Sequence, residues 1–343
     1  MGQFNKPAKS NQELVQQWKA RGLVISDEAR AERYLEHISY YRFSAYTIPF
    51  QQLNNPNHHF KPNTTFDDIL NLYIFDRELR LLVLDAIERI EVSVRTQISN
   101  VMGTQAQNPF WYMQESYFKK DFNIYRLLAQ IEKQLAEEQQ RLERDEKHIQ
   151  KRYKNNNNID EQERDRLLNN VRKENFLRHY LTQYSTPKLL PSWMMIEMLT
   201  WGELSHLYAG LSEKHQKPIA KNLGVQAPIL ESWLKVLNDV RNICAHHSRL
   251  WNREFGRVIK TPISQNRLWL SSEIKLNNQH INAEKRLYPI LVAIQVLLYT
   301  ISPNSTWAKR LKALLDSYPD IQKEYMGIPQ NWELDSFWDK ALR

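Results

Sequence analysis

The chain is poor in glycine, which accounts for only 8 of its 343 residues, well below the usual share of about 7%. Sheets, barrels and phosphate-binding loops need glycine wherever φ must be positive. Neither glycine-rich nucleotide-binding pattern, GxGxxG or GxxxxGK[ST], occurs in the sequence. The shortage argues against an all-β fold and against Rossmann and P-loop enzymes, and it favours an all-α fold.

Cysteine and long apolar runs are also scarce. The single cysteine, Cys244, excludes a disulfide framework and fits a reducing compartment. The longest apolar stretch, Tyr288–Ile301, has about 14 residues and contains Gln295, whereas a membrane-spanning helix needs about 20 apolar residues. We therefore expect a soluble cytoplasmic protein without a membrane partner.

Positive charge is in excess, and the excess is local. The net charge is +8, which favours an anionic partner. The charges of residues 132–178 nearly cancel, since this segment contains 12 Lys and Arg and 11 Asp and Glu. Residues 241–275 hold 7 Lys and Arg against 2 Asp and Glu. The sequence therefore places the basic surface in the later segment.

Hydrophobic periodicity predicts helices along most of the chain. Apolar residues recur at three- and four-residue steps over residues 66–102, which predicts one long amphipathic helix. Asp27 is a suitable cap for a helix that ends at Ile38, and residues 54–65 are a loop. Further segments are expected to be helical: a charged hairpin over 123–183 that turns at 155–158, and helices over 193–211, 228–245, 288–301 and 306–315, the last capped by Ser305. The middle and late segments together predict a bundle of four or five helices.

One run carries the most chemical information: Arg241-Asn242-Ile243-Cys244-Ala245-His246-His247. Arginine is always charged, and its forked donors suit phosphate oxygens. Histidine titrates near neutral pH and can transfer protons. The two side chains supply the minimum for metal-independent RNA cleavage, in which a ribose 2′-OH attacks the adjacent phosphate.

The geometry of this run leaves two interpretations open. An intact helix places Arg241 and His246 about 140° apart, whereas Asn242 and His246 share a face. A catalytic pair therefore needs Arg241 to reach around, a helix that loosens near Ala245, or two chains that join their motifs. The alternative is that Arg241 pairs with a carboxylate while His246 and His247 only stabilise the helix C-terminus.

A thiol or metal mechanism is less consistent with the pattern. Cys244 and His246 lie on opposite faces of a helix, and Cys244 continues an apolar stripe through Val240, so we expect a buried structural thiol. HExxH and CxxC are absent from the sequence, and adjacent ligands rarely converge on one ion. We therefore expect no metal and no cofactor.

Three further groups are candidate site residues. Glu91 and Arg95, four residues apart, are expected to give structural support, with an orienting role toward the motif as the alternative. Aromatic and basic side chains of a second group could stack on and grip single-stranded RNA: Tyr40, Tyr41 and Arg42. The third group follows the motif and could track phosphates: Arg249, Arg253, Arg257, Lys260 and Arg267.

The motif resembles the R-polar-x-x-x-H signature of HEPN-domain ribonucleases, and the wider chain resembles the Abi-D/F (Abi_2) abortive-infection proteins. The resemblance covers roughly residues 12–338 and rests on these segments: Tyr40–Tyr46, Arg80–Leu82, Ile90–Arg95, Pro191–Met198, Ala245–Asn252 and Met326–Trp332. It implies an all-α, HEPN-like helical bundle, an antiphage role and RNA as substrate. A homodimer that faces two motifs toward each other would complete one site, and a structured noncoding RNA is a plausible regulator.

On this resemblance the chain divides into an N-terminal helical module over residues 1–60, a HEPN-like domain over 61–302 interrupted by the hairpin at 123–183, and a C-terminal helical extension over 303–343. Arg241, Asn242 and His246 would be catalytic, with His247 as the reserve base.

The first functional hypothesis is a toxic endoribonuclease that leaves a 2′,3′-cyclic phosphate. The second is a noncatalytic protein that holds a structured RNA. In the third, the hairpin is the interaction arm of a regulatory helical partner.

Overall fold

The computed structural model describes residues 7–154, 161–262, 268–271 and 273–343. Over these ranges the chain forms fourteen α-helices, six short 3₁₀ helices and three isolated β-bridges, without a β-strand. This confirms the all-α fold. The residues divide into two compact units, one formed by Met1–Ile90 with Val236–Arg343 and the other by Glu91–Lys235.

The first unit begins with three short helices: α1 (Asn11–Ala20), α2 (Glu28–Ile38) and α3 (Tyr40–Thr47). Asp27 caps α2 by accepting from the Arg30 amide at 2.8 Å, as predicted. Trp18, Phe43 and Phe66 pack their rings together, and this cluster joins the short helices to the start of α4.

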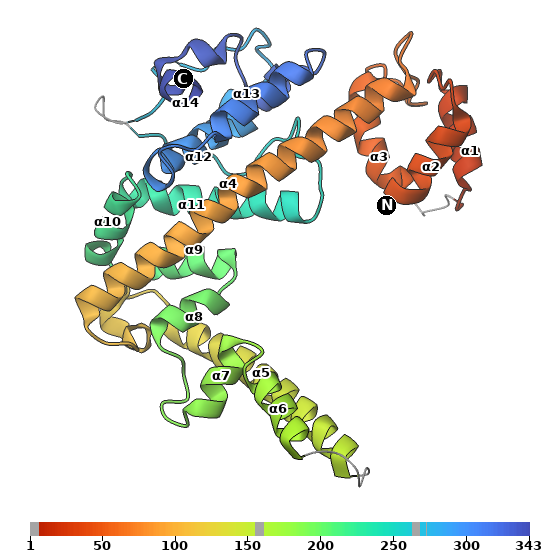
Figure 1. Ribbon diagram of the computed structural model, residues 1–343. Coiled ribbons are helices and arrows are strands. Elements are labelled where there is room, and N and C mark those ends of the chain that lie inside the picture. The colour runs from red at the N-terminus through yellow and green to blue at the C-terminus, as the bar shows by residue number, and fades with distance from the viewer. Residues whose placement is uncertain (1–6, 155–160, 263–267, 272) are drawn as a thin grey trace. The chain divides into compact units, whose positions relative to one another are not determined.

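Helix α4 (Phe66–Ala106) is one continuous helix of 41 residues (Figure 1). The prediction of a long helix from Phe66 to about Met102 is confirmed, with one further turn at its end. In the first unit its buried face includes Ile69 and Val83, both fully buried.

The later part of the first unit contains the end of α11 (Ala227–Ala245), then α12 (Leu287–Ile301), α13 (Trp307–Ser317) and α14 (Ser336–Leu342). Every residue of α12 from Leu287 to Tyr299 is buried, which confirms the expected central helix. Its position is reinforced by Tyr299, whose hydroxyl donates to the Phe337 carbonyl at 2.6 Å. The Ser305 hydroxyl accepts from the Trp307 amide at 3.2 Å, at the start of α13.

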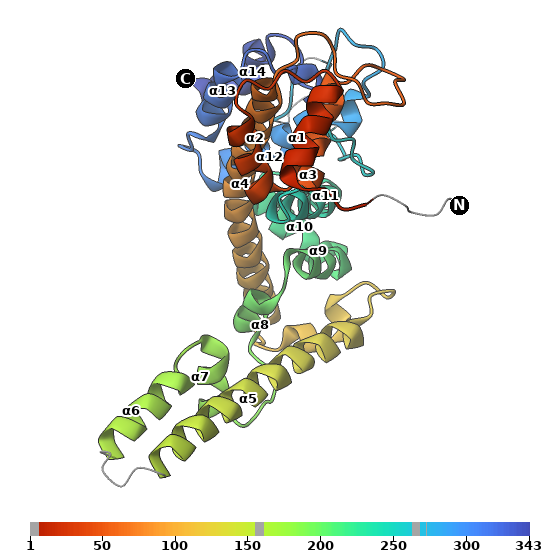
Figure 2. The ribbon, with the colours of Figure 1, turned by 90° about the vertical axis from the view of Figure 1, so that its right-hand side faces the viewer.

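The second unit contains the remaining helices: the end of α4, α5 (Ile124–Lys154), α6 (Glu161–Arg172), α7 (Phe176–Gln183), α8 (Ser192–Met198), α9 (Trp201–Gly210), α10 (Glu213–Asn222) and the start of α11. Helices α5 and α6 lie side by side in opposite directions, and α7 packs on α5 (Figure 2). The 3₁₀ helices of the chain are Ile48–Phe50, Trp111–Met113, Glu115–Tyr117, Ala283–Lys285, Lys323–Met326 and Trp332–Leu334.

A buried arginine holds the α5–α6–α7 hairpin together. The Arg178 guanidinium, on α7, pairs with Glu138 at 2.7 Å and Asp145 at 2.9 Å, both on α5, and with Glu174. Arg178 and Glu138 are both buried. The predicted turn at 155–158 lies outside the described residues.

The prediction of a single helix over 193–211 is wrong. The chain leaves the helical conformation at Leu199 and begins α9 at Trp201. Thr200 and Glu203 form a reciprocal capping box, in which the Thr200 hydroxyl accepts from the Glu203 amide and the Glu203 carboxylate accepts from the Thr200 amide. The expected module boundaries near residues 60 and 303 stay a prediction.

Candidate functional site

The Arg241–His247 motif ends helix α11. Two turn bonds close the helix, from the His247 amide to the Cys244 carbonyl at 3.0 Å and from the Ser248 amide to the Ile243 carbonyl at 2.9 Å. His247 has a left-handed backbone with φ of 55°. This is a Schellman ending with histidine where glycine is usual. The helix therefore ends at Ala245, directly before the two histidines of the motif.

The four polar side chains of the motif are accessible and make no hydrogen bond or ion pair within the described part of the chain. Arg241 and Asn242 are partly exposed, and His246 and His247 are exposed. No described carboxylate pairs with Arg241, so the described residues do not supply the ion pair of the alternative interpretation. Four groups that can bind an anion or move a proton are left available at one helix end.

The end of the motif and the four residues that follow it are bound to α3 and α4 at three points. The Arg42 guanidinium, from α3, donates to the His247 carbonyl. In the other direction, the Arg249 guanidinium donates to the Ala45 carbonyl of α3 at 2.7 Å. The amides of Leu250 and Trp251 donate to the Asp76 carboxylate on α4. We call residues 246–251 the anchored loop.

Asp76 is the centre of a buried polar network that sequence reasoning missed. Its carboxylate accepts from the Tyr46 hydroxyl at 2.6 Å and from the Arg80 guanidinium. Arg80 also donates to the Tyr46 hydroxyl at 3.0 Å. Asp76 lies seven residues after Ile69 and seven before Val83, on the apolar face of the predicted helix. A carboxylate at a position that is expected to be buried was the sequence signal for this network.

Burial shapes the electrostatics of this network. Burial raises the pKa of Asp76, while the Arg80 charge and the donors from Tyr46, Trp251 and Leu250 oppose that rise. The described partners of this carboxyl group are all donors, so its hydrogen bonds are those of a carboxylate. Burial, reinforced by the Asp76 charge, also raises the pKa of the Cys244 thiol to about 12. Cys244 is therefore the expected buried, protonated thiol.

The aromatic and basic residues of α3 have divided roles. Tyr40 stacks on Trp18 with ring centroids 5.2 Å apart, and Arg42 is engaged with His247. Tyr41 is 90% exposed. Of the three predicted RNA contacts on α3, Tyr41 is the one with a solvent-exposed ring, and it lies next to Arg42, which binds the motif.

The basic residues after the motif are partly engaged within the protein. Burial lowers the pKa of Arg249, which is partly buried against α3. Arg253 donates to the Arg249 carbonyl at 3.1 Å, and Arg257 pairs with Asp239 at 3.3 Å. Lys260 is exposed, and Arg267 lies outside the described residues. The predicted phosphate track is thus not a continuous row of unpaired cations.

A comparison with protein-family models matches residues 33–252 to the family described as Abi-like protein. The chain belongs to the Abi-like family. Searches among curated proteins and solved structures give no significant match. The family match includes the motif, Tyr41 and Asp76, and it ends at Asn252, before Arg253.

The other predicted residues of this Abi-like protein lie in the second unit. Arg95 is buried and pairs with Glu91, and its guanidinium donates to the carbonyls of Ile196 and Leu199, the latter at 2.7 Å. These bonds join α4 to the end of α8. The supporting role that the sequence favours for Glu91 and Arg95 stays a prediction.

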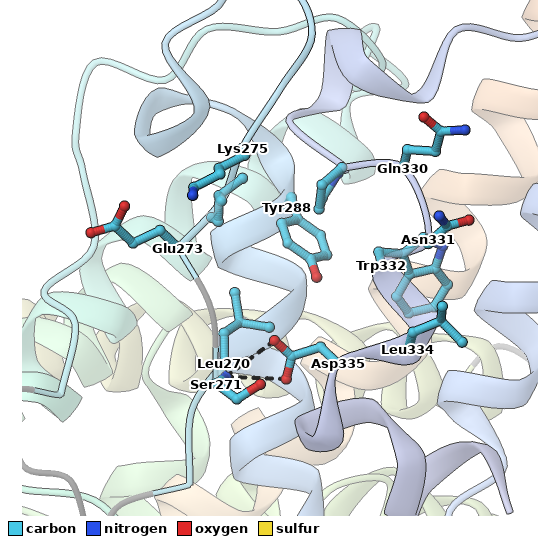
Figure 3. A pocket seen from close by; sticks show the side chains of 12 residues that line it. Leu270, Ser271, Glu273, Lys275, Tyr288, Gln330, Asn331, Trp332, Leu334 and Asp335 are labelled. Carbon is cyan, nitrogen blue, oxygen red and sulfur yellow. Dashed lines mark hydrogen bonds between the residues drawn. The ribbon is translucent and has the colours of Figure 1, made fainter.

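The Abi-like chain also contains a cavity away from the motif. It has a volume of about 520 Å³ in the first unit and is lined by residues 270–271, 273–275, 288, 329–332 and 334–335 (Figure 3). Tyr288 is buried, and its hydroxyl accepts from the Trp338 indole at 3.0 Å. No motif residue lines this cavity. Among the described residues, no three His, Cys, Asp or Glu side chains form a cluster suited to a metal ion, and none of their helices is long and apolar enough to cross a membrane.

Proposed function

We propose that this Abi-like protein is a metal-independent endoribonuclease of the HEPN type that acts as a toxic effector in abortive infection. Membership of the Abi-like family supports a role in abortive infection. The observation that carries the nuclease proposal is the accessible end of α11, where Arg241, Asn242 and His246 make no hydrogen bond or ion pair to the described residues.

The chemistry assigns one task to each side chain. His246 takes the proton of the ribose 2′-OH as the oxygen attacks the adjacent phosphorus, and the proton is later returned to the departing 5′-oxygen. Arg241 stabilises the negative charge that develops on the phosphoryl oxygens. Asn242, four residues before His246 on the same helical face, orients the imidazole or the phosphate. His247 is the second candidate for the base.

A second copy of the chain would complete the site. In one chain an arginine and a histidine five residues apart do not share a helix face. Two α11 ends related by a two-fold axis would place Arg241 of one copy near His246 of the other. The proposal therefore includes a homodimer. From the family resemblance it also includes RNA as substrate and a structured noncoding RNA as regulator.

The experiment compares purified wild-type protein with His246→Ala and Arg241→Ala on labelled RNA in EDTA. We expect wild-type cleavage with a 2′,3′-cyclic phosphate end, and a loss of at least about 100-fold in each variant. The matched controls are His37→Ala and Arg33→Ala, which change exposed residues of α2. Full cleavage by the His246→Ala, Arg241→Ala double variant would refute the proposal.

A noncatalytic RNA-binding function is the second candidate, and the exposed Tyr41 ring favours it. Base stacking on an aromatic side chain needs no proton transfer. In this case wild-type protein binds RNA without cleaving it, and His246→Ala leaves the affinity unchanged. A filter-binding assay run beside the cleavage assay separates the two functions.

A further inference from the structure

We infer that Asp76 is a positioning residue that fixes the anchored loop, and through it the motif, by binding two backbone amides with one carboxylate oxygen. The effect on cleavage rests on the proposed nuclease function. The effect on the loop itself does not, so the two can be tested separately.

The two oxygens of Asp76 have different partners. Oδ2 accepts from the Tyr46 hydroxyl and from Arg80, both within the α3–α4 pair. Oδ1 accepts from the amides of Trp251 at 2.6 Å and Leu250 at 3.1 Å, and the Leu250 amide also lies 3.3 Å from Oδ2. One oxygen is therefore held by the scaffold while the other holds the anchored loop.

This division makes the carboxylate a rigid link. Asp76 is fully buried, Tyr46 is 1% exposed, and Arg80 is 5% exposed, so solvent cannot replace a lost partner without disrupting the packing. The Oδ2 partners fix the orientation of the carboxylate plane, and that plane sets where the two amides must lie. Leu250 and Trp251 follow His246 by only four and five residues, so their position limits where the motif can point.

Filling this part of the core with charged side chains is energetically unfavourable. Burying a carboxylate and a guanidinium costs desolvation free energy, and apolar side chains of similar size often stabilise a core equally well. Apolar side chains, however, offer no acceptor to the amides of Leu250 and Trp251, which would stay buried and unpaired. The main contribution of the network is therefore to supply hydrogen-bond acceptors for the backbone of the anchored loop, and not to stabilise the core.

Asp76→Asn tests the link because it preserves shape and removes one acceptor. Arg80 is charged and is the strongest donor around the carboxylate, so we expect the single oxygen of the introduced carboxamide to face Arg80 and Tyr46. The NH₂ group of that carboxamide then faces the donors of Leu250 and Trp251. The substitution thus breaks the loop side of the link and leaves the scaffold side bonded.

Tyr46→Phe is the matched variant on the opposite side of the carboxylate. It deletes one Oδ2 donor and leaves Oδ1 available to both loop amides. Asp85→Asn is the surface control, since Asp85 is also on α4 but is partly exposed and pairs with Arg89 and Arg310. A merely structural role predicts similar effects of Asp76→Asn and Tyr46→Phe, whereas a positioning role predicts different ones.

The first measurement is hydrogen–deuterium exchange of peptides that contain Leu250 and Trp251. In Asp76→Asn we expect exchange there to become roughly 10- to 100-fold faster, with less than about threefold change in Tyr46→Phe and Asp85→Asn. Unchanged protection at Leu250 and Trp251 in Asp76→Asn, in a variant that is still folded by circular dichroism, would overturn the inference.

The second measurement is RNA cleavage, with kcat and KM determined separately. We expect Asp76→Asn to lower kcat roughly 10- to 100-fold while KM changes less than about threefold, because the exposed RNA contacts are kept. A fall in kcat in Tyr46→Phe as large as in Asp76→Asn would contradict positioning through Oδ1. If wild-type protein cleaves no RNA, the proposed function fails while the exchange result still decides the role of Asp76.

Discussion

Replacing Arg178 with methionine should destabilise the α5–α6–α7 hairpin far more than an ordinary surface substitution. Methionine keeps much of the length of the side chain but leaves Glu138, which is 8% exposed, without its buried cation. Breaking one side of a buried ion pair typically costs about 3–5 kcal/mol. Water reaches the other two partners of Arg178, since the side chains of Glu174 and Asp145 are half exposed or more. We therefore expect a loss of about 2–3 kcal/mol in Arg178→Met.

The matched control is Arg141→Met, because Arg141 also pairs with the Glu138 carboxylate, at 3.3 Å. Its side chain is 58% exposed, so its removal should cost less than about 1 kcal/mol. Urea unfolding gives the free energy, and limited proteolysis within α5 and α6 shows whether the loss is local. Equal destabilisation by the two variants would refute the idea that the buried Arg178 guanidinium holds the hairpin together. A loss of unfolding free energy below about 1 kcal/mol in Arg178→Met would refute it as well.

Two further predictions concern pH and RNA binding. Burial, with a smaller contribution from Lys214, lowers the pKa of His215, so the unfolded chain binds this proton more readily than the folded one. Stability should therefore fall as the pH drops below about 6.5, by at most about 1.4 kcal/mol per pH unit. His215→Phe should flatten this slope in urea titrations between about pH 7.5 and 5.5, and an unchanged slope would contradict the assignment. Tyr41→Ala should weaken the binding of single-stranded RNA by about 1–3 kcal/mol, measured by fluorescence anisotropy. A loss as large in Tyr125→Ala, which changes an exposed ring on α5, would show that the effect is unspecific.

The sequence was sufficient for helices whose apolar residues follow one face. Helix α4 was predictable because its stripe runs without interruption, and Asp27 was recognisable as a cap because capping is local. The division between α8 and α9 was missed because apolar residues continue through Leu199 without glycine or proline. The available signal was the Thr200-x-x-Glu203 pattern, which is that of a capping box.

The candidate site was only partly predictable for a different reason. The motif and its place at a helix end follow from a short stretch of sequence. The partners of the anchored loop do not, because Asp76 and Leu250 are 174 positions apart and Arg42 and His247 are 205 apart. Such pairs depend on how α3, α4 and α11 pack, which no local pattern specifies.

Three arginines around the anchored loop donate to backbone carbonyls and so keep their charge available for the RNA that we propose as substrate. Arg42 donates to the His247 carbonyl, Arg249 to the Ala45 carbonyl, and Arg253 to the Arg249 carbonyl. A carbonyl oxygen immobilises a guanidinium without cancelling its charge, whereas a carboxylate would do both. The positive field near the motif is therefore preserved, and the side chains that produce it have already lost much of their conformational freedom. An anionic backbone that approached this region would meet preorganised charge, so less ordering free energy would be lost on binding.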